Sequence, residues 1–124
     1  MATILIIEDN ANNFRLMDRI LQRYKYQILH AETGEAGIEM AFAHRPDLIL
    51  LDLGLPDVDG QTIAGMLKQP EGLPDTPLIV VTAWPQETAR QMVDAYGCEG
   101  YIPKPIDTRA FAAQVATFLG SSTG

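Results

Sequence analysis

Three uninterrupted apolar runs recur at intervals along the first two thirds of the chain. They are TILII near the N-terminus, LILL at residues 48–51 and LIVV at residues 78–81. A strand buried on both faces is apolar at successive positions, whereas a strand with one solvated face alternates. The segments between these runs carry apolar residues at helical spacing. Together they indicate an α/β domain in which helices cover both faces of a parallel sheet.

The pattern predicts five strands and five helices. The predicted strands are Thr3–Ile7, Gln27–Ala31, Leu48–Leu51, Leu78–Thr82 and Gly100–Ile102. The first predicted helix follows a cap at Asn10 or Asn12, and the second follows a cap at Thr33. The third runs from Gln61 to Gln69, the fourth from Pro85 to near Gly97, and the fifth starts after Asp107. The second strand is mixed in composition and suits a sheet edge. The tail, residues 120–124, is small and polar and is expected to fray.

Length and charge narrow the possible functions. The 124 residues suit one domain, residues 1–124, with a core at about 3–119. A formal net charge of −7 argues against nucleic acid or an anionic membrane as the main partner. No apolar run approaches the ~20 residues that span a bilayer, and no signal-peptide pattern is present. The lone Cys98 fits a reducing compartment, so we expect a cytoplasmic protein.

Polar side chains stand at or just past the ends of four predicted strands. They are Glu8 and Asp9, Asp52, Thr82, and Lys104. Singly, each has an ordinary explanation as a helix cap, a turn former or a solvated charge. In an open α/β sheet, however, the carboxyl ends of parallel strands form the crevice where ligands bind. Their common position therefore predicts one site.

The predicted site has a chemistry of its own. Two carboxylates ~4 Å apart repel by ~4 kcal/mol at an effective dielectric of ~20, so positive charge is needed beside them. Lys104 supplies one charge, and the oxygen-only ligand set favours Mg²⁺ or Mn²⁺ over zinc. Asp52 can then act as a nucleophile that forms an acyl phosphate. Lys104 and the metal would neutralise the transferred group, and Thr82 could donate its hydroxyl to a phosphoryl oxygen.

Taken together, these motifs resemble the receiver domain of two-component response regulators over about residues 3–119. The matching pieces are IIEDN, LILLDLGLPDVDG, VVTA and YIPKP. The resemblance implies a flavodoxin-like five-stranded parallel sheet in the order 2-1-3-4-5 with five flanking helices. The pieces EDNxxN and GCEGYIPKPI also look similar to receivers of cell-cycle regulators and hybrid histidine kinases.

The resemblance also implies a role for each matching residue. It implies that Asp52 is the phosphoacceptor. It implies metal ligands at Glu8, Asp9, Asp52 and the Gly54 backbone carbonyl, with Asp9 the more direct ligand of the acidic pair. It also implies phosphate-binding or switch residues at Thr82, Lys104 and Tyr101, and a cis bond at Lys104–Pro105. Two positions depart from commoner choices in the family. Gly54 has no side chain to assist or shield attack by water, and Trp84 is bulky. We therefore expect this pair to tune the lifetime of the acyl phosphate.

The implied function is a stand-alone receiver, not a turnover enzyme. It would take phosphate from a sensor histidine kinase or a histidine phosphotransfer protein and change its protein interactions through the face of the fourth helix, fifth strand and fifth helix. It would act as a monomer or a phosphorylation-dependent dimer. Alternatives are a docking-only receiver and an aspartyl-phosphate phosphatase. A haloacid-dehalogenase-like phosphatase needs a second Asp where Gly54 stands, and a nucleotide or flavin module would need a Gly-rich loop.

Overall fold

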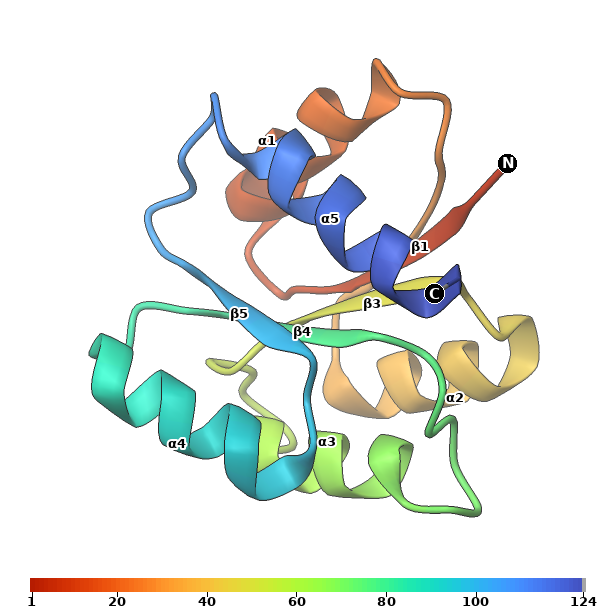
Figure 1. The fold of residues 1–124 in the computed structure, drawn as a ribbon, viewed down its shortest axis with the longest axis vertical. Coiled ribbons are helices and arrows are strands. Elements are labelled where there is room, and N and C mark those ends of the chain that lie inside the picture. Colours follow the sequence, from red (N-terminus) through yellow and green to blue (C-terminus); the bar gives the residue numbers. More distant parts are fainter. Residues whose placement is uncertain (124) are drawn as a thin grey trace.

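Five parallel strands form one sheet between two layers of helices in the computed structural model, which describes residues 1–123, with side chains through residue 120 (Figure 1). The strands are β1 Thr3–Ile7, β2 Gln27–Ala31, β3 Leu48–Asp52, β4 Leu78–Thr82 and β5 Gly100–Pro103. The helices are α1 Ala11–Gln22, α2 Gly34–His44, α3 Gly60–Lys68, α4 Gln86–Tyr96 and α5 Phe111–Thr123. The strand order is β2-β1-β3-β4-β5, so the predicted flavodoxin-like order is confirmed.

The sheet separates two hydrophobic clusters. Figure 1 shows α1 and α5 on one face and α2, α3 and α4 on the other. Alternate residues of β1, β3 and β4 point to opposite faces, so these strands need apolar side chains at each position. Ile4, Ile6 and Leu50 pack with Met17 and Phe111 under α1 and α5. The other cluster lies under α2, α3 and α4 and includes Leu5, Ile7, Leu51, Ile63 and Met92. The apolar runs of the sequence are thus the centre of both clusters.

Side chains and backbone geometry set the helix ends. Asn10 Oδ1 accepts a hydrogen bond from Asn13 N–H at 3.0 Å, which settles the two predicted caps of α1 in favour of Asn10. Thr33 caps α2 as predicted. Gly97 ends α4 with φ at +74°, in the left-handed region that glycine enters at little cost.

Several predicted boundaries move by a few residues. Asp52 belongs to β3, and α3 begins at Gly60 because Asp59 caps it through Thr62 N–H. Pro85 precedes α4 with extended ψ and lies outside its first turn. Asp107 accepts from the backbone N–H groups of two following residues, which holds a turn and delays α5 to Phe111. The shifts at α3 and α5 follow from the side chains of Asp59 and Asp107, which accept hydrogen bonds from the backbone at the start of each helix or just before it.

The predicted tail, residues 120–124, is helical as far as Thr123, and its fraying stays a prediction. α5 continues to that residue, and Gly124 lies outside the described residues. A single glycine inside a helix costs about 1 kcal/mol relative to alanine, which is too little to break a helix that packs on a sheet. None of the helices within residues 1–123 is both long and apolar enough to cross a membrane.

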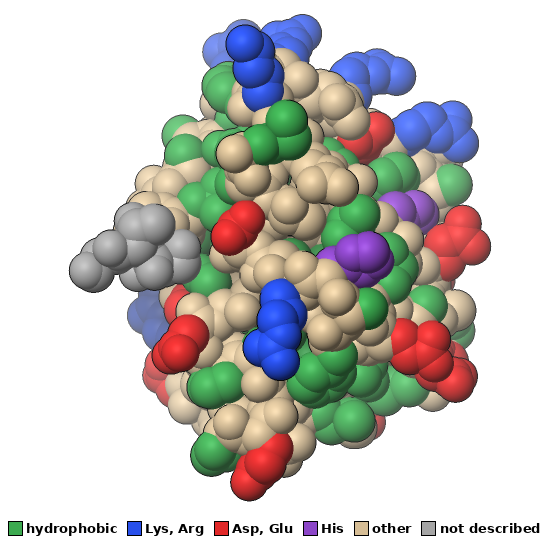
Figure 2. Space-filling view, turned by 90° about the vertical axis from the view of Figure 1, so that its right-hand side faces the viewer, with side chains coloured by type: hydrophobic (Ala, Val, Ile, Leu, Met, Phe, Trp, Pro, Cys, Tyr) green, Lys and Arg blue, Asp and Glu red, His purple; other side chains and the backbone are tan. Residues whose placement is uncertain are grey.

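Surface charge is unevenly distributed. Figure 2 shows Lys and Arg side chains gathered at the top of the molecule, whereas Asp and Glu side chains lie mainly lower down. In Figure 1 this end holds α1 and the turn that follows it. A chain with a net charge of −7 therefore carries a local basic region.

Candidate functional site

The carboxyl ends of four neighbouring strands bring the predicted residues together. Glu8 and Asp9 follow β1, Asp52 ends β3, Thr82 ends β4, and Lys104 follows β5. Carboxylate oxygens of Glu8, Asp9 and Asp52 all lie within 4.8 Å of one another. The register places Asp52 beside Val81, so Thr82 lies at the same edge of the sheet. The crevice predicted from the sequence is therefore present as a cluster of three acids, a lysine and a hydroxyl.

Lys104 links the acids. Its Nζ donates to Asp52 Oδ1 at 2.8 Å and lies 3.5 Å from Glu8 Oε1. Burial favours the neutral amine, but the hydrogen bond and charge of Asp52, with the charge of Glu8, outweigh burial and raise the pKa of Lys104. Its backbone N–H donates to Thr82 C=O at 2.8 Å, and the Lys104–Pro105 bond is cis. The lysine is thus held at both its main chain and its side chain.

Asp52 is a buried, ionised carboxylate. Its side chain accepts from Lys104 and from Gly54 N–H at 3.1 Å, and only 5% of the residue is exposed. Burial favours the neutral acid. The hydrogen bonds from Glu8, Lys104 and Gly54 outweigh burial and lower the pKa of Asp52. The residue therefore keeps its nucleophilic, charged form at neutral pH.

Glu8 has the opposite environment. It is fully buried, and Oε2 accepts from Asn10 N–H at 3.2 Å, while Oε1 has no hydrogen-bond partner among the described residues. Burial and the neighbouring Asp52 raise the pKa of Glu8 to about 7. A buried carboxylate oxygen that lies near two more carboxylates, forms no hydrogen bond within the described part of the chain and has only the Lys104 ammonium at 3.5 Å fits a bound cation.

The main chain of Glu8 is fixed by the edge strand. Glu8 N–H donates to Ala31 C=O at 3.0 Å, and His30 Nε2 donates to Glu8 C=O at 2.8 Å. The His30 ring stacks on Phe14, with centroids 3.6 Å apart and planes at 4°. His30 of β2 therefore positions a residue of the acidic cluster.

The remaining predicted residues lie on the helix α4 side. Thr82 is buried, and its hydroxyl oxygen accepts from Trp84 N–H at 2.9 Å. Trp84 and Tyr101 are both half-buried and pack against the hydrophobic cluster under α2, α3 and α4. Tyr101 pairs with Val80 in the sheet, away from the strand ends. The structure thus joins Tyr101 to the packing beneath α4 and not to the acidic cluster.

Asp57 has a structural role that the sequence pattern does not reveal. Its two carboxylate oxygens accept from Gly34 N–H at 2.9 Å and Glu35 N–H at 3.1 Å. The hydrogen bonds from these two N–H groups lower the pKa of Asp57. The loop after Asp52 is therefore tied to the start of α2. In the sequence, the one sign that α2 could bind an acidic side chain from elsewhere is that its own cap, Thr33, carries no charge.

Replacing Asp57 with alanine is expected to loosen this tie. The carboxylate stabilises the folded state above its ordinary pKa of 3.8, and this contribution is lost as the pH falls through the lowered folded value. In Asp57→Ala, the amides of Gly34 and Glu35 should exchange faster at pH 7, measured by NMR hydrogen exchange. Asp57→Asn keeps one of the two acceptor oxygens and should retain part of the protection. Equal exchange in wild type and Asp57→Ala would contradict this account.

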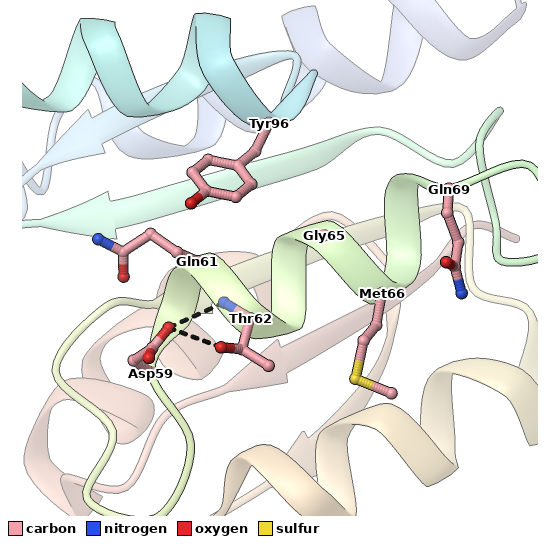
Figure 3. A pocket seen from close by; sticks show the side chains of 7 residues that line it. All are labelled: Asp59, Gln61, Thr62, Gly65, Met66, Gln69 and Tyr96. Atoms are coloured by element: carbon pink, nitrogen blue, oxygen red, sulfur yellow. Dashed lines mark hydrogen bonds between the residues drawn. The ribbon is translucent and has the colours of Figure 1, made fainter.

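A hollow of about 560 Å³ lies away from the acidic cluster, along α3 and the end of α4. Figure 3 shows its lining side chains, with Asp59 bonded to the backbone and hydroxyl of Thr62 at one end and Tyr96 above the helix. Its lining side chains are two amides, the hydroxyls of Thr62 and Tyr96, the thioether of Met66 and the capping carboxylate of Asp59. The hollow has no nucleophile held by a cation, so the strand-end cluster is the better candidate for chemistry.

Comparisons with known proteins agree with this geometry. Residues 4–116 match the family described as the response regulator receiver domain. The chain is 33% identical over 120 residues to the polar-differentiation response regulator DivK of Brucella anthropi. The alignment covers 97% of this chain and 98% of that protein.

Solved structures show the same fold. The signal receiver domain of a LuxO repressor protein from Vibrio parahaemolyticus has a TM-score of 0.89 at 28% identity, over 98% of this chain and 92% of that one. A CheY-like receiver domain protein from Methanospirillum hungatei has a TM-score of 0.90 at 23% identity, over 99% and 97% of the two chains. With its match over residues 4–116, the chain belongs to the family of response regulator receiver domains.

Proposed function

We propose that this receiver accepts a phosphoryl group on Asp52 from a phosphorylated histidine of a sensor kinase or a phosphotransfer protein. The observation that supports this most is Lys104 Nζ, which lies 2.8 Å from a buried, ionised Asp52 and 3.5 Å from Glu8. A carboxylate oxygen of Asp52 would form the new bond to phosphorus as the P–N bond of the donor breaks, and the electron pair would leave on the imidazole nitrogen. Lys104 would then follow the negative charge onto the phosphoryl oxygens.

The residues present fit a divalent ion, and we propose Mg²⁺ or Mn²⁺. Glu8, Asp9 and Asp52 would hold it, with the Gly54 carbonyl as a further oxygen ligand. When bound, the ion neutralises charge on the transferred group and on the acids. Asp9 is exposed and can meet an entering ion, whereas Glu8 is buried beneath it.

The proposed signal passes from Thr82 to α4. A phosphoryl group adds about −1.5 to −2 charges and strong acceptor oxygens. Thr82 would turn its hydroxyl toward them and release the N–H of Trp84. Trp84 and Tyr101 share the hydrophobic cluster beneath α4, so a change at Thr82 would alter the packing under that helix. The face of α4, β5 and α5 would then change its affinity for a target protein by the usual 1–3 kcal/mol of coupling.

The proposal is tested by incubating the protein with acetyl phosphate and Mg²⁺ and measuring its intact mass. We expect an adduct of about 80 Da, the mass of one phosphoryl group, with Mg²⁺ and none with EDTA. Absence of an adduct from acetyl phosphate and from a phosphorylated histidine kinase would favour a docking-only receiver. Continuous release of phosphate from many small esters would instead favour a phosphatase.

Trp84 is expected to slow hydrolysis of the acyl phosphate. It is half-buried, lies two residues after Thr82 and is anchored by its own N–H to the Thr82 hydroxyl. Gly54, two residues after Asp52, supplies no side chain that could shield Asp52, so Trp84→Ala should give water more access and speed dephosphorylation several-fold. The decay of phosphorylated protein after removal of acetyl phosphate gives the rate. Trp84→Phe, which keeps an aromatic ring, is the matched control; equal decay in wild type and Trp84→Ala would exclude shielding by Trp84.

A further inference from the structure

Three consecutive peptide groups around the acidic pair are each held by a hydrogen bond. Glu8 N–H donates to Ala31 C=O at 3.0 Å, and Glu8 C=O accepts from His30 Nε2 at 2.8 Å. Asn10 N–H donates to Glu8 Oε2 at 3.2 Å. These bonds hold the peptide before Glu8, the peptide that joins Glu8 to Asp9, and the peptide after Asp9. Because each peptide is planar, the bonds restrict the backbone dihedral angles of both acids.

The middle bond differs from a ladder bond because its donor is a side chain. β1 and β2 pair in register up to Ile7 and Ala31. The ladder stops there because β2 ends at Ala31 and Thr33 already caps α2. The imidazole of His30 therefore supplies a donor where the backbone of the partner strand turns away. A carbonyl oxygen can only accept, so Nε2 carries the proton in this bond.

The ring of Phe14 sets the orientation of this donor. The two rings are half-buried and stacked, with centroids 3.6 Å apart and planes at 4°. Phe14 is itself held in the first turn of α1, where its N–H donates to Asn10 C=O at 3.0 Å. The stack fixes the plane of the imidazole and hence the direction of its Nε2–H. His30 is thus held on its ring face and bonded at its ring edge.

The orientation of the Glu8–Asp9 peptide decides where the two acids point. Glu8 is fully buried and Asp9 is exposed, yet their carboxylate oxygens lie within 4.8 Å of each other and of Asp52. Adjacent residues of a straight strand point to opposite faces, so the chain must turn here to bring both carboxylates to one place. Mg²⁺ needs oxygen ligands at about 2.1 Å in nearly ideal geometry. A rotation of this one peptide would therefore misplace one acid relative to the other.

We propose that His30 is a positioning residue for the divalent ion, acting through the Glu8–Asp9 peptide. The proposal rests on the proposed metal site. Of the three bonds, one comes from the backbone of β2 and one ends on the carboxylate of Glu8 itself. His30 is therefore the position at which the acidic pair can be released without removal of an acid. Groups that orient metal ligands by hydrogen bonds typically change metal affinity by about 10- to 100-fold when they are replaced.

The test separates the donor from the ring. His30→Phe keeps a ring that can stack on Phe14 but removes the donor, and His30→Gln restores an N–H donor of similar reach. His44→Phe makes the same change at an exposed histidine at the end of α2 and is the matched control. Mg²⁺ is titrated into each protein without phosphodonor, and the amide signals of residues 8–10 and 52–54 are followed by NMR. We expect about tenfold weaker binding in His30→Phe, with His30→Gln and His44→Phe close to wild type.

A second measurement needs no metal. In EDTA, the amide of Asn10 should exchange faster in His30→Phe than in wild type, because its acceptor belongs to Glu8, whose following peptide is released. His30→Gln should restore slow exchange. The amide of Glu8 bonds to the backbone of β2, so its exchange should change less.

Two results would overturn the proposal. One is an equal Mg²⁺ affinity in wild type and His30→Phe, and the other is an equal loss in His30→Gln and His30→Phe, which would assign the effect to the imidazole ring and not to its donor. A purely structural His30 would lower the free energy of urea unfolding in His30→Phe and leave the Mg²⁺ affinity of the folded protein unchanged. If Mg²⁺ shifts no signal in wild type, the proposed metal site fails. Unchanged exchange of Asn10 in His30→Phe would then refute the positioning role separately.

Discussion

Asp52→Asn is expected to leave no phosphoryl adduct after incubation with acetyl phosphate and Mg²⁺. The amide nitrogen is a poor nucleophile and the amide oxygen carries no charge, so no stable bond to phosphorus can form at this position. The variant should fold, because Asn can accept the bonds from Lys104 and Gly54 that Asp52 now accepts. Intact mass is the measurement, with wild type showing the adduct of about 80 Da.

Asp57→Asn is the matched control for this experiment. Asp57 is an acid of the same loop, five residues further along, and is exposed and bound to the start of α2. Its variant should keep the adduct. An adduct that survives in Asp52→Asn and disappears in Asp57→Asn would move the phosphoacceptor to Asp57. An adduct that survives in both would place it on another residue.

Glu8→Gln is expected to stabilise the metal-free protein at pH 8 by on the order of 2–3 kcal/mol. Glu8 has an ordinary pKa of 4.5 and a folded pKa of about 7, and each tenfold change in proton affinity is worth about 1.4 kcal/mol. The folded state binds this proton more tightly than the unfolded state. The stability that it gives is therefore complete below pH 4.5 and is lost as the pH rises through 7. Glutamine is neutral throughout and avoids that loss.

The measurement is urea unfolding in EDTA at pH 5 and pH 8. The free energies of unfolding of wild type and Glu8→Gln should be similar at pH 5 and differ at pH 8. Mg²⁺ should raise the stability of wild type at pH 8, since ligands stabilise the state that binds them, and should do less for Glu8→Gln. Glu71→Gln, in an exposed loop, is the control and should match wild type. A less stable Glu8→Gln at pH 8 would refute the assignment of buried charge to Glu8.

The charge of Asp52 changes the free energy of unfolding in the opposite direction to that of Glu8, and at a lower pH. Its pKa is lowered, so its charged form stabilises the fold above pH 3.8, and that contribution is lost as the pH falls further. The two titrations therefore separate. Loss of stability between about pH 5 and 7 reports Glu8, and acid unfolding below pH 4 includes Asp52.

The α/β fold could be predicted because three of its five strands are continuous apolar runs in the sequence. β1, β3 and β4 are buried on both faces, and a run of Ile, Leu and Val has few other stable uses. Parallel strands alone place their carboxyl ends at one edge, so Glu8, Asp52 and Thr82 could be grouped without coordinates. The order of the strands was not in the pattern and came from the resemblance to receivers.

The parts of the site that could not be predicted depend on contacts distant in sequence. Glu8 and Asp9 are adjacent acids, yet Glu8 is fully buried and Asp9 is exposed. Which of them points inward depends on the path of the chain after β1. The bond from Asp57 to Gly34 spans 23 residues and requires a specific loop geometry.

The stacking of Phe14 on His30 has a consequence for how the acidic corner can respond. His30 holds the carbonyl of Glu8 and Ala31 holds its amide, so the peptide groups on both sides of Glu8 are fixed to β2. Gain or loss of charge at Glu8 must then be absorbed by side chains and not by displacement of the strand. The backbone around Glu8 therefore stays in place while the charge of its side chain changes. Under the proposed function, we therefore expect conformational change at the other half of the strand edge, where the Lys104 N–H donates to the Thr82 carbonyl.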